Sequence, residues 1–135
     1  MEEYLHADLT KEIISAFYEV YNTLGYGFLE KVYENSLMIE LMDRRFKVEN
    51  QKSISVHFKG RITGEYFADK VVGDKVILEL KAVEKINEEH EFQLINYLKA
   101  TEIEVGLLLN YGKHPQICRK VFSNKNKSLN LRRSA

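Results

Sequence analysis

Two charged side chains interrupt an apolar, β-branched run of the sequence. In VILELKAV, residues 76–83, Glu79 and Lys81 stand two positions apart within a segment that otherwise predicts a buried strand. Burying an unpaired charge costs free energy. Because side chains alternate across a strand, Glu79 and Lys81 point to one face, while the leucines at 78 and 80 point to the other. The pattern therefore predicts a polar site on one face of a core strand.

A third charged residue, Asp69, lies in the preceding predicted strand. The connection around Gly73 and Asp74 reads as a tight hairpin, and its length decides the register. A two-residue loop would place Asp69 opposite Leu78, on the wrong face. A three-residue loop or a bulge would place Asp69 opposite Glu79. A site that uses all three charges requires the second register, which we predict.

The chemistry of these residues is that of a metal site. Two carboxylates on one face repel each other unless a cation lies between them. Magnesium prefers oxygen ligands and keeps several waters, so two carboxylates leave room for a phosphate oxygen and an attacking water. Lys81 could orient or deprotonate that water, or stabilise charge on the phosphate. We therefore expect phosphodiester hydrolysis with Mg²⁺ or Mn²⁺, with Asp69 and Glu79 as metal ligands. The alternative is a Glu79–Lys81 salt bridge at a sheet edge, with Asp69 on the surface beside a turn.

The elements that must position these residues follow from hydrophobic periodicity. Three segments have the period of an amphipathic helix: residues 8–24, 28–43 and 87–101. Five segments have the pattern of strands: residues 51–58, 63–72, 76–83, 104–112 and 116–122. The fold class is therefore α/β, a mixed β-sheet flanked by helices in the order α-α-β-β-β-α-β-β, with the strand over 104–112 inside the sheet. In the second helix, the inward side chains are expected to be Leu29, Val32, Leu37 and Leu41.

Length and composition bound the class of protein. The 135 residues, of which 44% are hydrophobic, support a single domain over residues 1–122 and a basic, polar tail over residues 123–135. The net charge of zero indicates nothing for or against nucleic acid. The single cysteine excludes an internal disulfide framework and a multi-cysteine zinc site. The first residues lack the apolar segment of a signal peptide, and no run is long enough for a membrane span, so we expect a cytoplasmic protein without membrane association.

Several motifs together resemble a known family. GFLEKVY, residues 27–33, fits the pattern G-x-x-E-x-x-Y, and GEYFADKVVGDKVILELKAV, QLINYLKAT and VGLLLNYG follow it in order. In these motifs the chain is similar to the bacterial and archaeal GxxExxY protein family, which is placed in the PD-(D/E)XK nuclease superfamily. The resemblance covers roughly residues 8–122. It implies a single nuclease-like domain with a restriction-endonuclease-like core. It also implies a prokaryotic, metal-dependent nuclease, for which DNA is the expected substrate.

The resemblance also implies roles for single residues. Asp69 corresponds to the first carboxylate of the superfamily motif, and Glu79 with Lys81 to its (D/E)-x-K pair; Ala68 stands where the superfamily has proline. Gln93 and Tyr97 match the Q-x-x-x-Y pattern of RecB-like nucleases. These two side chains are one helical turn apart, so both can face the substrate as catalytic residues.

The acidic residue on the helix before the sheet corresponds to Glu30 or Glu34. These two are also one turn apart, and either could be a third metal ligand. Glu34 is the preferred candidate, because it follows Tyr33 and precedes an apolar run, and Glu30 is the additional one.

Basic residues near the expected site indicate how substrate could be held. Lys70 and Lys99 are the candidate contacts to nucleic-acid phosphates. Because the chain is almost all scaffold, a homodimer or a protein partner is one way to hold DNA. The rival function is a catalytically silent nuclease-fold module that binds nucleic acid or a protein partner. No catalytic residue that the resemblance implies is missing, which favours the enzyme.

Overall fold

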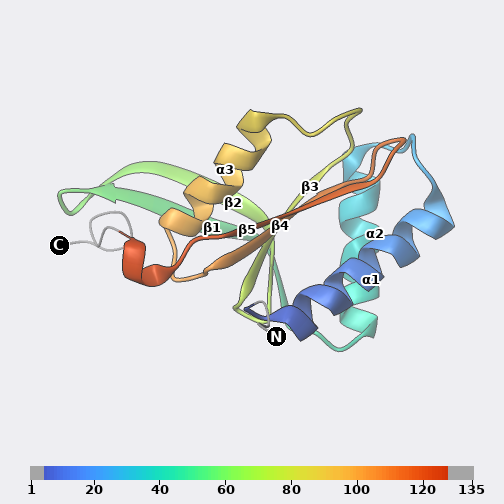
Figure 1. The fold of residues 1–135 in the computed structure, drawn as a ribbon, viewed down its shortest axis with the longest axis horizontal. Coiled ribbons are helices and arrows are strands. Elements are labelled where there is room, and N and C mark those ends of the chain that lie inside the picture. Colours follow the sequence, from blue (N-terminus) through green and yellow to red (C-terminus); the bar gives the residue numbers. More distant parts are fainter. Residues whose placement is uncertain (1–4, 128–135) are drawn as a thin grey trace.

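The computed structural model describes residues 5–127, and these form helices on both faces of one sheet (Figure 1). The elements in chain order are α1 (Ala7–Leu24), α2 (Glu30–Asp43), β1 (Val48–Phe58), β2 (Arg61–Val72), β3 (Val76–Lys81), α3 (Glu88–Lys99), β4 (Val105–Asn110), β5 (Gln116–Val121) and the short 3-10 helix η1 (Asn124–Asn126). The predicted α/β class and the predicted order of helices and strands are confirmed. In the part of the chain that the structure describes, no helix is long and apolar enough to cross a membrane.

The five strands lie side by side in the order β1-β2-β3-β4-β5. All neighbours are antiparallel except β3 and β4, which are parallel. A parallel pair needs a crossover connection, and α3 provides it. β4 is buried along its whole length between β3 and β5, so the predicted position of this strand inside the sheet is confirmed.

The helices cover opposite faces of the sheet (Figure 1). α1 and α2 pack on one face, in a core that includes Phe17, Leu37, Leu78 and Leu80. α3 packs on the other face, where Leu94 and Leu98 meet the side chains of Ile77 and Leu108. The strict alternation along β3 therefore divides its side chains between two cores.

α2 buries a different face from the one expected. Leu37 and Leu41 are buried as predicted, but Leu29 is 81% exposed and Val32 is also exposed. Leu29 precedes the first turn of the helix, so its distance in sequence from the later leucines does not place it on a face of α2. Tyr33, Leu37 and Leu41 follow one another at intervals of four residues, and the tyrosine ring takes the inward place that was assigned to Val32.

β2 and β3 pair over three residues each, Lys70–Val72 with Val76–Leu78. A three-residue loop joins them, in which Gly73 and Asp74 have φ angles of 59° and 58°. This is the predicted register, and its continuation sets Asp69 against Glu79. Beyond this point β2 leaves β3 and continues with β1 as a separate hairpin (Figure 1). We call the point of divergence, at Asp69 and Glu79, the fork.

Asn110, buried at the end of β4, holds the segment that joins β3 to α3. Its side-chain oxygen accepts a hydrogen bond from the Val83 N–H at 3.0 Å, and its amide donates to the Val83 carbonyl at 2.9 Å and to Gln116 Oε1 at 3.2 Å. The same Gln116 oxygen accepts from the Ile86 N–H at 3.2 Å. A Cβ at Gly112 would overlap the Val83 carbonyl oxygen, so only glycine fits there. These contacts fix the direction in which the chain leaves Lys81 towards α3.

The expected tail begins at residue 123, and residues 128–135 lie outside the described part of the chain. Before them, the Lys127 ammonium donates to the carbonyls of Thr101 and Ile103 at 2.9 and 2.7 Å. The end of residues 123–127 is thus attached to the loop that precedes β4. A domain boundary at residue 122 stays a prediction.

Candidate active site

Two carboxylates meet at the fork. The Asp69 N–H donates a hydrogen bond to Glu79 Oε1 at 3.1 Å, and the Leu80 N–H donates to Asp69 Oδ2 at 2.7 Å. Each carboxylate thus takes the place of a strand carbonyl that the diverging backbone no longer supplies. The second oxygen of each group is left for a proton shared between the two carboxyls, or for a cation.

Burial raises the pKa of Glu79 to about 8, and the negative charge of Asp69 adds to this effect. The Asp69 N–H and the charge of Lys81 act in the opposite direction, but they do not offset burial of a side chain that is only 4% exposed. Without a cation, the pair therefore holds one proton near neutral pH. A metal ion that binds both carboxylates would displace this proton.

Glu30, the first residue of α2, reaches the same cluster. Burial raises its pKa; the positive charge of Lys81 opposes this, while the charges of Asp69 and Glu34 add to it. α2 also contacts β3, so the N-terminal end of α2 lies on the side of the sheet from which these charges act on Glu30. The predicted clustering of Asp69, Glu79 and Lys81 is thus present, with Glu30 next to it.

Tyr33 anchors the loop that precedes Glu30. Its hydroxyl donates to the Gly25 carbonyl at 2.7 Å and accepts from the Phe28 N–H at 3.3 Å. Its ring stacks on Tyr111 with centroids 4.5 Å apart and planes 9° apart. Gly27 has a φ of 109°, which favours glycine. The G-x-x-E-x-x-Y segment therefore consists of a loop glycine, the first residue of α2 and the tyrosine that anchors the loop, and this role of Tyr33 was not predicted.

Glu34, the preferred third ligand from the sequence, lies in a different environment. It is buried, and its Oε1 accepts from Gln51 Nε2 at 3.5 Å. Its charge acts on Lys70, raising the pKa of that ammonium against the larger lowering by burial. The charges of Asp69 and Lys81 act on Glu30, whereas the contact of Glu34 is the hydrogen bond from Gln51.

Lys70 does not fit the surface contact to substrate that was expected. It is fully buried, and its Nζ donates to Asn50 Oδ1 at 2.6 Å. Its side chain points to the α1–α2 face because it follows Asp69 directly and side chains alternate along β2. The correction is that Lys70 balances the charge of Glu34 inside the protein.

α3 brings Gln93 and Tyr97 to the fork from the other face of the sheet. The Gln93 amide donates to the Tyr97 hydroxyl at 2.9 Å. Burial raises the pKa of Tyr97 to about 12, and the charges of Glu79 and Asp69 add to the increase. The hydroxyl therefore stays protonated at neutral pH and lies within electrostatic reach of both carboxylates.

The start of α3 is fixed by a reciprocal cap. Asn87 Oδ1 accepts from the His90 N–H at 2.9 Å, and His90 Nδ1 accepts from the Asn87 N–H at 3.2 Å. Lys99, the other expected substrate contact, lies at the far end of the helix, with Nζ 5.6 Å from the centroid of the Phe122 ring. Lys99 is thus well separated along α3 from Gln93.

The donor set suits a hard divalent ion. Within residues 5–127, no three Asp, Glu, His or Cys side chains form a ready ligand cluster for a metal ion. The close pair of Asp69 and Glu79 supplies oxygen ligands and excess negative charge, as Mg²⁺ and Mn²⁺ prefer. Mg²⁺ commonly takes one or two carboxylates and completes its coordination with water and substrate phosphate, so this pair fits it.

A mixed sheet with an aspartate and a Glu-x-Lys pair at a fork between strands defines a nuclease-like α/β domain. The chain belongs to the PD-(D/E)XK nuclease superfamily, whose family model matches residues 7–121. Among solved structures it is similar to the crystal structure of SSO0001, with a TM-score of 0.53 and 17% sequence identity. The alignment covers 87% of this chain and 61% of that one, and the likeness shows a shared fold. No curated protein matches the sequence.

The raised pKa of Glu79 predicts how stability depends on pH without metal. Between the ordinary value of 4.5 and about 8, the folded protein holds a proton that the unfolded chain has released, so the free energy of unfolding falls as pH rises. Glu79→Gln cannot titrate and should be more stable than the natural protein at pH 8, by an amount on the order of a few kcal/mol. Urea unfolding in EDTA at pH 5.5 and pH 8 measures both effects.

The matched control is Glu19→Gln, on the exposed face of α1. It should keep the pH dependence of the natural protein. If Glu79→Gln and the natural protein lost stability equally between the two pH values, Glu79 would not be the titrating group.

Proposed function

We propose that the protein is a Mg²⁺- or Mn²⁺-dependent nuclease that hydrolyses phosphodiester bonds, with DNA as the first substrate to test. The observation that carries the proposal is the carboxylate pair at the fork, in which Glu79 bonds to the Asp69 N–H and Asp69 to the Leu80 N–H. An edge salt bridge would leave Asp69 at the surface beside a turn. Membership of the PD-(D/E)XK nuclease superfamily supports the same reaction class.

Each residue has a role that its position permits. Asp69 and Glu79 would hold the ion, which supplies Lewis-acid stabilisation of the phosphate and a water of lowered pKa. Lys81 would orient the attacking water or balance charge on the phosphate as an ammonium, or deprotonate the water as the neutral amine. The Tyr97 hydroxyl donates a hydrogen bond to the substrate, and Gln93 fixes the orientation of that hydroxyl.

Glu30 is the third acidic residue that we assign to the site. It is the first residue of α2, a helix that contacts β3, and the charges of Asp69 and Lys81 act on it, so it would hold the Lys81 ammonium in place or orient water at the site. We assign Glu34 to the interior, where it balances the buried Lys70.

A silent module with the same fold remains the rival function. The two carboxylates already bond to backbone N–H groups, so they have a structural purpose without catalysis. Turnover and metal dependence separate this silent module from the nuclease.

Two further expectations belong to the nuclease. It would act on cellular DNA in the cytoplasm, and a homodimer would give this small domain a longer surface for binding DNA.

Cleavage of end-labelled single-stranded and duplex DNA, and of RNA, tests the proposal directly. The natural protein should cleave at least one of them with Mg²⁺ or Mn²⁺ and none in EDTA. Asp69→Asn and Glu79→Gln should each lower the rate about 100-fold or more, because each removes charge on which the ion depends. The double variant should be no slower than either single variant, since the two carboxylates act as one unit.

Glu19→Gln, prepared in the same way, controls for contaminating nucleases and should cleave at the natural rate. Equal cleavage by the natural protein and Glu79→Gln would show that the activity belongs to a contaminant. Absence of both cleavage and metal binding would favour the silent module.

The two acidic residues of α2 should separate by phenotype. Glu30→Gln should lower the cleavage rate about tenfold or more and leave the free energy of unfolding within about 1 kcal/mol of the natural value, because the residue is partly exposed. Glu34→Gln should lower the free energy of unfolding by more than about 1 kcal/mol, because the buried Lys70 loses its compensating charge. Rates and urea unfolding of the two variants are compared at one pH. If Glu34→Gln slowed cleavage and Glu30→Gln lowered the free energy of unfolding instead, Glu34 would be the site residue.

A further inference from the structure

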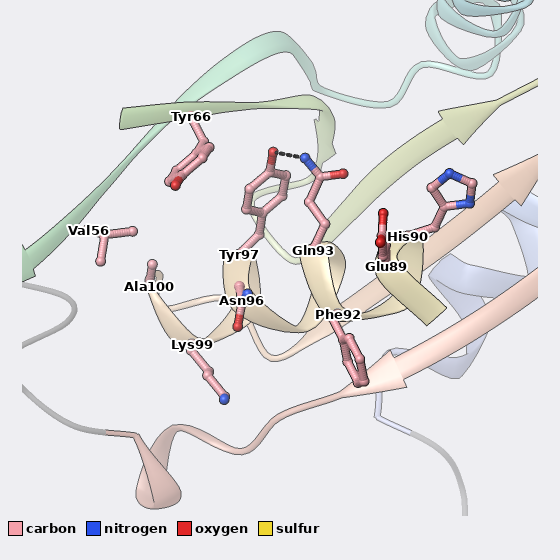
Figure 2. Close-up of a pocket in the computed structure, with 10 residues that line it drawn as sticks. All are labelled: Val56, Tyr66, Glu89, His90, Phe92, Gln93, Asn96, Tyr97, Lys99 and Ala100. Atoms are coloured by element: carbon pink, nitrogen blue, oxygen red, sulfur yellow. Dashed lines mark hydrogen bonds between the residues drawn. The ribbon is translucent and has the colours of Figure 1, made fainter. Parts of the chain in front are cut away.

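A groove of about 600 Å³ lies between α3 and the β1–β2 hairpin (Figure 2). Val56 and Tyr66 of the hairpin form one wall, and Gln93, Asn96 and Tyr97 of α3 are on the other. The groove exists because β1 and β2 continue past the fork as a separate hairpin beside α3. Its volume is that of a site for a ligand of small-molecule size.

The groove leads to the fork. Tyr97 is a wall of the groove, and it also packs in one core with Ile77 of β3, which lies on the same face of the strand as Glu79. Figure 2 shows the hydrogen-bonded Gln93 and Tyr97 side chains together on the side of α3 that faces β2. A nucleotide whose phosphate lies at the fork would therefore have its neighbouring base at the mouth of this groove.

Tyr66 offers an aromatic face to whatever occupies the groove. The residue is 47% exposed, and its ring centroid lies 6.0 Å from that of Tyr97 at an interplanar angle of 44°. A Cβ at Gly64 would come within 3.0 Å of the Tyr66 ring, so the glycine leaves room for the ring to lie along the strand. The ring thus lies along the groove, and a base stacked on an aromatic side chain typically strengthens binding about five- to 150-fold.

The polar groups suit a base better than a run of phosphates. Side-chain amides, such as those of Asn96 and Gln93, can donate to and accept from the edge of any base. Glu89 and Lys99 bring one charge of each sign to the groove, so it has little net attraction for a polyanion. Stacking, with hydrogen bonds to the base edge, is therefore the main recognition that this groove can supply.

We propose that this groove binds an unpaired nucleobase next to the phosphate at the fork, and that the protein acts on single-stranded nucleic acid. The proposal rests on the proposed function for the position of the phosphate, but base binding itself needs neither metal nor turnover. A base inside a duplex is already stacked on both faces and paired along its edge, so it must be extruded at a free-energy cost before it can enter. An unpaired base pays only the cost of unstacking.

The test is binding by the full-length protein in EDTA, measured by fluorescence anisotropy with labelled 12-nucleotide probes. The probes are single-stranded DNA, single-stranded RNA of the same sequence, and the DNA duplex. At least one single strand should bind about tenfold or more tightly than the duplex, and the better strand identifies the sugar. Tyr66→Ala should weaken single-strand binding about tenfold, and Tyr66→Phe should retain it, because the ring is what stacks.

Phe67→Ala is the matched control. Phe67 is the next residue of β2, is 57% exposed, and points to the opposite face of the strand. It should change single-strand binding less than twofold. Equal losses in Tyr66→Ala and Phe67→Ala, or tighter binding of the duplex, would overturn the proposal.

The outcome is independent of catalysis. A protein that binds single strands through Tyr66 but cleaves none of them would support the groove and count against the nuclease. A protein that cleaves single strands while Tyr66→Ala has unchanged affinity and unchanged KM would overturn the groove and leave the nuclease intact.

Discussion

The hydrogen bonds that end the β2–β3 ladder are the constraint on which the rest of the structure depends. Where the two strands diverge, the N–H groups of Asp69 and Leu80 lose their strand partners, and buried N–H groups must be satisfied. The carboxylates of Glu79 and Asp69 satisfy them. The same two bonds orient the second oxygen of each carboxylate, so the end of the ladder and the candidate metal site are one structure. A hydrophobic pair at positions 69 and 79 could neither accept hydrogen bonds from these N–H groups nor bind a metal ion.

The fork also explains how helices on opposite faces of the sheet reach one place. A continuous sheet would separate Glu30 of α2 from Tyr97 of α3. Because the residues of β2 before Lys70 do not pair with β3, both side chains come within electrostatic reach of Asp69. The divergence has a second consequence, since it carries the β1–β2 hairpin alongside α3 and opens the groove under Tyr66. Metal chemistry and base recognition would thus both derive from the same break in strand pairing.

Local patterns were sufficient to predict the order of elements, the hairpin register and the common face of Glu79 and Lys81, because period-two alternation and loop length determine them. The burial of Lys70 could also have been predicted from the sequence, because a residue adjacent to Asp69 must point to the opposite face. The inward face of α2 could not be predicted in this way, since it depends on Tyr33 stacking against Tyr111, a contact between distant parts of the chain. The position of Tyr66 beside the groove could not be predicted either, because it depends on how far the β1–β2 hairpin extends past α3.

The most direct test of the central claim is a crystal of the protein grown with Mn²⁺ at a pH above 8, with anomalous diffraction recorded at the manganese absorption edge. We expect an anomalous peak about 2.0–2.3 Å from one oxygen of Asp69 and one of Glu79, with the remaining ligands supplied by water. The hydrogen bonds from the Asp69 and Leu80 N–H groups to the two carboxylates should also be present in this metal-bound crystal. Clear density for both carboxylates with no peak between them, at saturating Mn²⁺, would contradict the account and leave the pair as a purely structural end to the ladder.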